Sequence, residues 1–202
     1  MRREPLPVRP PSTATRWKQA RRVGQTTAVE PSQSALIVAV PEAEPVVAAH
    51  RDRLDRAASW GVPAHVTVLY PFLPPERIDE RVRAVLGQVS AAVPAFFLTL
   101  GRLCWFGDQV LWLAPDPPGP FRALTAAVTA RFPGVPPYGG RFEDVVPHLT
   151  LGHDHPVEVL RAAGEAVRPQ LPIHARVSSL RLIAGDPVPG DSWTTLAEFP
   201  LG

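Results

Sequence analysis

Two short segments of the chain repeat the same pair of chemically active side chains. Residues 63–68 read PAHVTV and residues 147–151 read PHLTL, so a histidine and a threonine are separated by one apolar residue in each segment. A neutral imidazole can take a proton while a second, protonated imidazole gives one, and threonine hydroxyls donate hydrogen bonds to phosphate oxygens. The two copies therefore favour metal-independent acid–base catalysis on a phosphodiester by four residues: His65, Thr67, His148 and Thr150.

Both copies lie in apolar runs that are typical of strands. A single H-x-T segment often contains no more than a hydrogen-bonded core histidine, but two copies in similar contexts favour an active site. Because side chains alternate along a strand, His65 and Thr67 share one face while Val66 and Val68 point to the other. If the two strands lie close together, their polar faces line one cleft.

Apolar periodicity and turn residues predict the remaining elements. We expect strands at 34–40, 65–70, 96–100, 103–106, 110–114, 147–152, 173–185 and 192–201, and helices at 41–60, 74–89, 118–132 and 156–167. Helices and strands alternate, but a hairpin interrupts the order, so the pattern predicts an α+β fold with a mixed or antiparallel sheet. No strand is followed by a glycine-rich nucleotide loop, so we expect no cofactor.

The first 33 residues differ in composition from the rest of the chain. They hold seven Arg or Lys against two Glu and show no periodicity, so we expect residues 1–33 to be a disordered basic tail and 34–202 to form the folded domain. Cys104 is the single cysteine, which excludes an intramolecular disulfide, and no apolar run is long enough to span a membrane. We therefore expect a cytoplasmic monomer with no membrane association and no obligate protein partner.

The sequence around both motifs resembles a known family. HVTVLYPFLPPE (65–76) and PPYGGRFEDVVPHLTLG (136–152) are similar to segments of the 2H (two-histidine) phosphoesterases, in the branch called 2'-5' RNA ligase-like or RNA cyclic phosphodiesterase proteins. The resemblance covers residues 34–200. It implies a duplicated, two-lobed α+β fold with outer helices and a central cleft.

The resemblance also implies roles for the motif residues. His65 would be the general acid that protonates the leaving oxygen, His148 the base that activates water, and Thr67 and Thr150 the residues that hold the phosphate. The implied substrate is a nucleotide or RNA end that carries a 2',3'-cyclic phosphate or a 2',5' linkage.

Two alternatives use the same cleft. One is a module that binds nucleotides or RNA ends without turnover, and the other is a reversible 2'-5' RNA ligase. Many members of the family carry an arginine soon after the second motif, whereas here residues 152–155 read GHDH, which favours a small nucleotide over long RNA.

Other side chains are weaker candidates for substrate binding. Tyr70 and Phe72 follow the first motif and either stack on a base or pack in the core. Tyr138 and Arg141 lie in a glycine-containing loop before the second motif, where an aromatic ring and a guanidinium can contact a nucleotide. The residues 153–155, HDH, offer metal-ligand chemistry, but a short cluster of this kind is typical of a solvated turn, so we expect no metal.

Overall fold

The structure of the protein, a computed structural model, describes residues 31–141, 144–190 and 192–202. Nearly all of the predicted tail, 1–33, therefore lies outside the described residues. The strands are β1 (Gln33–Ala39), β2 (His65–Leu69), β3 (Phe96–Phe106), β4 (Val110–Asp116), β5 (Leu149–His153), β6 (Ile173–Val177), β7 (Ser179–Gly185) and β8 (Thr194–Pro200). The α-helices are α1 (Glu44–Leu54), α2 (Arg56–Ser59), α3 (Glu80–Ala91), α4 (Gly119–Arg131) and α5 (Val157–Val167).

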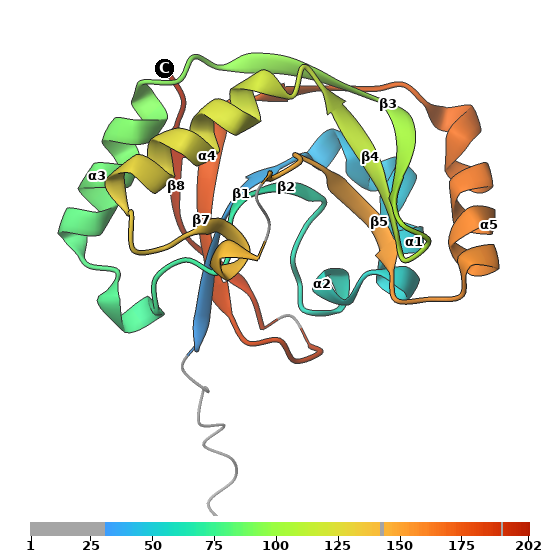
Figure 1. Ribbon diagram of the computed structural model, residues 1–202, viewed down its shortest axis with the longest axis horizontal. Helices are drawn as coiled ribbons and strands as arrows, with labels where there is room; N and C mark the ends of the chain where they lie inside the picture. The colour runs from blue at the N-terminus through green and yellow to red at the C-terminus, as the bar shows by residue number, and fades with distance from the viewer. Residues whose placement is uncertain (1–30, 142–143, 191) are drawn as a thin grey trace, which may run out of the picture.

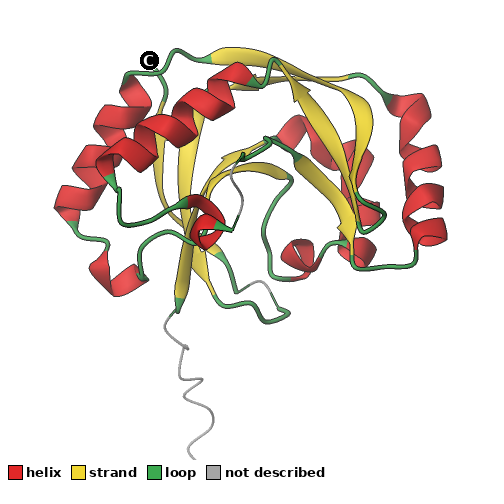
Figure 2. Cartoon of the chain, viewed as in Figure 1, coloured by secondary structure: helices red, strands yellow, loops and turns green. Residues whose placement is uncertain are grey.

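The strands form two four-stranded sheets, which confirms the predicted α+β fold with antiparallel sheets (Figure 2). The first sheet has the order β2-β1-β7-β8 and the second the order β5-β4-β3-β6. Every paired strand runs antiparallel to its neighbour. Each motif strand, β2 or β5, is thus an edge strand of its own sheet.

The helices cover the outer faces of the two sheets (Figure 1). Helices α3 and α4 pack on the first sheet, against β8 and β2, while α1 and α5 pack on the second, against β5 and β4. Each sheet with its two helices forms one lobe. The chain crosses between the lobes, because α1 precedes β2 in sequence but packs against β5. Among the described residues, no helix is both long enough and apolar enough to cross a bilayer.

Apolar stripes explain why these helices pack where they do. Phe121, Leu124 and Val128 recur along α4 at helical spacing and are fully buried. Asp79 caps α3 by accepting a hydrogen bond from the Val82 amide at 2.8 Å. Local sequence and core packing thus support the same elements.

Several predicted elements differ from the observed ones. The long strand expected at 173–185 is broken at Ser178 into β6 and β7, which belong to different sheets. The strands expected at 96–100 and 103–106 are one strand, β3, because Gly101 sits at a bulge rather than at a turn. The helix expected at 41–60 is interrupted at Asp55, whose backbone is extended and which starts α2 instead.

The two motif strands contact each other across the boundary between the sheets. Figure 1 shows β2 and β5 next to each other at the centre of the molecule, between the two groups of helices. Helix α1 packs tightly on β5, because a Cβ added at Gly152 would lie 2.7 Å from Leu54 Cβ and 2.9 Å from Leu160 Cδ2. The lack of a side chain at residue 152 thus fixes how closely α1 and α5 approach this strand.

We expect Gly152→Ala to lower the free energy of unfolding by about 1–3 kcal/mol, because the added methyl group overpacks the contact with Leu54 and Leu160. Urea unfolding measures this change. Gly119→Ala is the matched control, since a Cβ there meets no atom within 4 Å. Equal unfolding midpoints for G152A and the wild type would contradict the prediction.

Candidate active site

The two motif histidines lie in equivalent positions on the edge strands. His65 is the first residue of β2, and His148 immediately precedes β5. Val66 and Val68 are buried in the core, as are the alternating residues of β5, Leu149 and Leu151. The apolar residues of each motif therefore secure its strand, while the histidine and threonine point to the opposite face.

Both histidines make the same backbone hydrogen bond. His65 Nδ1 lies 2.7 Å from the carbonyl oxygen of Pro63, and His148 Nδ1 lies 2.8 Å from that of Val146. A carbonyl oxygen only accepts hydrogen bonds, so Nδ1 carries the proton in both rings. Nε2 is then the nitrogen that exchanges protons with a substrate in each case.

Tyr138 joins the first motif from a distant part of the chain. It lies in a 3-10 turn, Pro137–Gly140, where its backbone has a φ of 52°. Its amide donates a hydrogen bond to the Tyr70 carbonyl oxygen at 2.7 Å, and its hydroxyl hydrogen bonds to Thr67. The strained turn therefore serves to bring this ring beside the threonine predicted to bind phosphate.

The other aromatic candidates lie elsewhere. Phe72 is buried and packs edge-on against Phe132, with ring centroids 5.1 Å apart, so of the two roles that the sequence left open it has the one in the core. The Tyr70 hydroxyl donates to Gln33 Oε1 at 2.6 Å, and its ring contacts Trp193. Arg141 is exposed at the end of the Tyr138 turn and stays a prediction.

An aromatic cluster surrounds His148. The rings of Phe106 and Trp112 contact its imidazole edge-on, at centroid distances of 5.1 and 5.9 Å. A pocket of about 470 Å³ opens beside His148 and is lined by Phe106, Val110, Tyr138, Asp144, Val145 and Val146. From the sequence, Phe106 and Trp112 are only members of the expected strands 103–106 and 110–114, because nothing local shows that the β3–β4 hairpin pairs with the second motif strand.

Burial keeps both imidazoles neutral at neutral pH. Desolvation, followed by the positive charge of Arg51, lowers the pKa of His65 to about 4, although the Pro63 carbonyl and Asp55 oppose the shift. Desolvation also lowers the pKa of His148, and its hydrogen bond to Val146 and the charge of Asp55 oppose this effect. His148 is close enough to His65 to contribute to the lowering of that pKa.

A buried ion pair lies behind the histidines, and sequence analysis missed it. Arg51 Nε and Nη2 bind Asp55 Oδ2 at 3.0 and 2.9 Å, and both side chains are almost fully buried. His153 Nε2 lies 3.4 Å from Asp55 Oδ1. The sequence does not indicate that Arg51 and Asp55 are buried, because their burial depends on how α1 packs on β5.

The HDH segment does not gather metal ligands in the part of the chain that the structure describes, where no cluster of three suitable side chains is present. His153 contacts Asp55 and Asp154, the latter at 3.0 Å, and Asp154 adopts a φ of 57° in the turn after β5. The segment is the last residue of β5, His153, followed by a turn, and the His153 side chain reaches Asp55 between α1 and α2.

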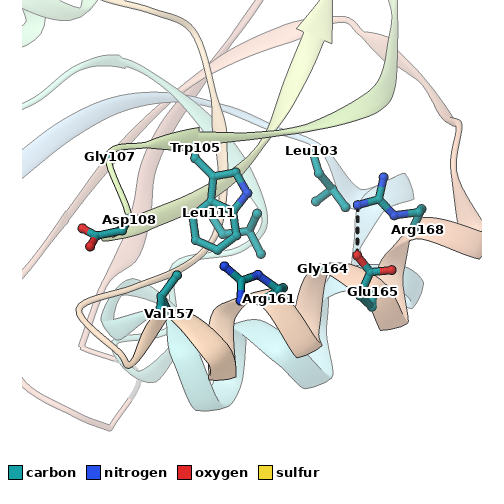
Figure 3. Close-up of a pocket in the computed structure, with 10 residues that line it drawn as sticks. All are labelled: Leu103, Trp105, Gly107, Asp108, Leu111, Val157, Arg161, Gly164, Glu165 and Arg168. Atoms are coloured by element: carbon teal, nitrogen blue, oxygen red, sulfur yellow. Dashed lines mark hydrogen bonds and ion pairs between the residues drawn. The ribbon is translucent and has the colours of Figure 1, made fainter.

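A second pocket, of about 450 Å³, lies between the β3–β4 hairpin and α5 (Figure 3). Leu103, Leu111 and Arg161 are among the residues that line it. Trp112 pairs directly with Thr150 across the sheet, so neighbouring Leu111 points to the opposite face. This pocket therefore lies behind the second sheet and contains no motif residue.

Comparison with known proteins identifies a family model that matches most of the chain and solved structures with the same fold. The family described as the 2'-5' RNA ligase superfamily matches residues 38–188. No curated protein matches the chain. Among solved structures, LigT of E. coli in its apo form has a TM-score of 0.54 at 19% identity, covering 86% of this chain and 99% of its own.

Two further structures show the same fold. E. coli LigT complexed with 3'-AMP has a TM-score of 0.52 at 22% identity, covering 85% of this chain and 99% of its own. TT0787 of Thermus thermophilus has a TM-score of 0.54 at 19% identity, covering 84% of this chain and 97% of its own.

The lowered pKa of His65 predicts a loss of stability in acid. Unfolding lets this imidazole protonate near its ordinary pKa of about 6.5, so stability falls as the pH drops from there to about 4, by up to about 3 kcal/mol. We expect His65→Asn to reduce this slope in urea unfolding measured between pH 7 and 4.5. His174→Asn, at an exposed position on β6, is the control, and the same slope in H65N and the wild type would refute the prediction.

Proposed function

The chain belongs to the 2'-5' RNA ligase superfamily of 2H phosphoesterases, and from that premise we propose that it hydrolyses a 2',3'-cyclic phosphate or a 2',5' phosphodiester. The observation that carries the proposal is the pair of H-x-T motifs on contacting edge strands. In both motifs the histidine presents Nε2 and has a threonine on the same strand face.

The proposed reaction needs no metal ion. His148 Nε2 accepts a proton from water, whose oxygen attacks phosphorus, and His65 Nε2 gives a proton to the ribose oxygen as its bond to phosphorus breaks. The product is a phosphomonoester with a free ribose hydroxyl. Thr67 and Thr150 donate hydrogen bonds to the non-bridging oxygens, and Tyr138 orients the Thr67 hydroxyl.

Substrate binding supplies the condition for protonation. Both imidazoles are neutral in the free protein at neutral pH, because their pKa values are lowered by burial. A phosphate anion between them favours the imidazolium form, since an opposite charge nearby raises a histidine pKa. One proton can then reside on His65 while His148 stays neutral.

The pocket beside His148 favours a small nucleotide. Its volume of about 470 Å³ falls in the range of small-ligand sites, and its aromatic and aliphatic lining suits a nucleobase. The two positions after the second motif supply no arginine to the site: residue 152 is a glycine that abuts Leu54, and residue 153 is a histidine that contacts Asp55. This supports the expectation of a short substrate over long RNA.

We expect the purified protein to open nucleoside 2',3'-cyclic phosphates or to cleave 2',5'-linked dinucleotides in the presence of EDTA. His65→Ala and His148→Ala should each lower kcat by at least about 10²-fold, because each removes one acid–base group. His174→Ala serves as the control. Calorimetric binding of a cyclic nucleotide with no product after long incubation would instead support a binding module.

We expect kcat/KM to be highest below pH 6.5 and to decline as the pH rises towards 8. The reaction requires one neutral and one protonated histidine, and both pKa values in the free protein are lowered, that of His65 to about 4. A pH–rate profile on the best cyclic nucleotide tests this. An optimum above pH 8 would contradict the assignment of both groups.

The threonines are tested separately. Thr67→Val and Thr150→Val each remove one hydroxyl donor, so kcat should fall by about 10²-fold, while Thr67→Ser and Thr150→Ser should keep most of the activity. Steady-state kinetics on the same substrate gives the comparison. Equal losses in the valine and serine variants would show that packing, rather than hydrogen bonding, is the role of these residues.

A further inference from the structure

We propose that the Asp55 carboxylate is a positioning residue for the two-histidine centre, because through Arg51 and His153 it ties the segment leading into β2 to the end of β5. The kinetic consequences of this inference rest on the proposed function, whereas the contacts from which it is argued do not depend on that function. Asp55 lies between α1 and α2, so it belongs to the chain segment that precedes the first motif.

Asp55 is buried to an extent that requires full pairing. Asp55 is 5% exposed to solvent and Arg51 is 2% exposed. Oδ2 accepts both hydrogen bonds from Arg51, while Oδ1 accepts from the Ala57 amide at 3.0 Å and faces His153 Nε2 at 3.4 Å. Both carboxylate oxygens therefore have partners. Removing one of these partners would leave the buried negative charge of Asp55 less well compensated.

The same ion pair holds the backbone just before the first motif. Arg51 Nη2 also donates to the Val62 carbonyl oxygen at 3.2 Å. Two residues later, the Ala64 amide donates to Glu44 Oε1 at 2.6 Å. Side chains of α1 thus fix the segment that places His65 at the start of β2.

The contact with His153 extends this support to the second motif strand. His153 ends β5, three residues after Thr150. Its two ring nitrogens face the carboxylates of Asp55 and Asp154. Carboxylates accept hydrogen bonds, so both nitrogens donate only when the ring is an imidazolium.

The charges around His153 favour that cationic form. The hydrogen bond to Asp55 raises the pKa of His153, burial opposes this, and Asp154 raises it further. Two arginines also face this group of charges, Arg51 through Asp55 and Arg56 of α2 through Asp154 at 3.3 Å, and His155 acts on Asp154 as well. The contact between His153 and the two carboxylates is therefore strongest while the ring is protonated, and it weakens as the pH rises through the raised pKa of His153.

A purely structural role would stop at helix capping and the ion pair with Arg51. Asp55 goes further, because its negative charge raises the pKa of both His65 and His148, which lie on different sheets. One buried charge thus acts on both halves of the centre.

Titration of the histidine rings by NMR tests the proposal without any substrate. We expect the pKa values of both His65 and His148 to fall in Asp55→Asn relative to the wild type. Unchanged values in a folded D55N protein would overturn the proposal. Because the readout needs no turnover, a wild type that hydrolyses none of the substrates would remove the proposed function but leave this test intact.

The partner residue gives a second test if D55N does not fold. His153→Leu removes the contact with Asp55 at a partly exposed position, and we expect kcat to fall by about 10- to 100-fold with KM within about twofold, because the histidines lose their alignment. His153→Gln keeps a donor for Asp55 and should recover most of this loss. Wild-type kcat in H153L, or equal losses in H153L and H153Q, would overturn the proposal.

Discussion

The candidate site depends on the contact between two edge strands of different sheets. Backbone hydrogen bonds hold β2 to β1 and β5 to β4, but no sheet ladder joins β2 to β5. Their relative position is set by side chains and helices that cross between the lobes. Helix α1 is the main crossing element. Its Leu54 packs against Gly152 of β5, and its Arg51 donates a hydrogen bond to Val62, in the segment that precedes β2.

This arrangement explains why a buried ion pair is present where a hydrophobic contact would cost less. Replacing buried charged pairs with apolar residues is often neutral or stabilising, so stability alone does not account for Arg51 and Asp55. A hydrogen-bonded pair fixes direction, which apolar packing does not. Directional contacts to Val62 and His153 match the need to hold two strands that share no ladder.

The sequence predicted the motif residues because their chemistry and their strand period are local properties. His65 and Thr67 share a face whatever the rest of the chain does, and the buried apolar neighbours confirm the alternation. The break at Ser178 and the interruption at Asp55 were missed, since both depend on which sheet or helix the next segment packs against. The local pattern is continuous at both places.

The same distinction applies to the surroundings of the motifs. The contact between Tyr138 and Thr67 joins residues far apart in sequence, and the sequence feature that pointed to it was the pair of glycines that permit the turn.

The two motifs are alike, but their environments are not, and this asymmetry bears on their roles. His148 is surrounded by the aromatic rings of Phe106 and Trp112, whereas His65 lies near the cation of Arg51. Burial and the charge of Arg51 both disfavour a positive charge on His65, and Asp55 offsets them only in part, so at neutral pH this imidazole needs a further anion beside it to hold the proton of a general acid. A phosphate bound at Thr67 is such an anion. The protonation that the proposed reaction requires is thus coupled to binding of the group that reacts, and an uncharged ligand in the same cleft would leave both histidines neutral.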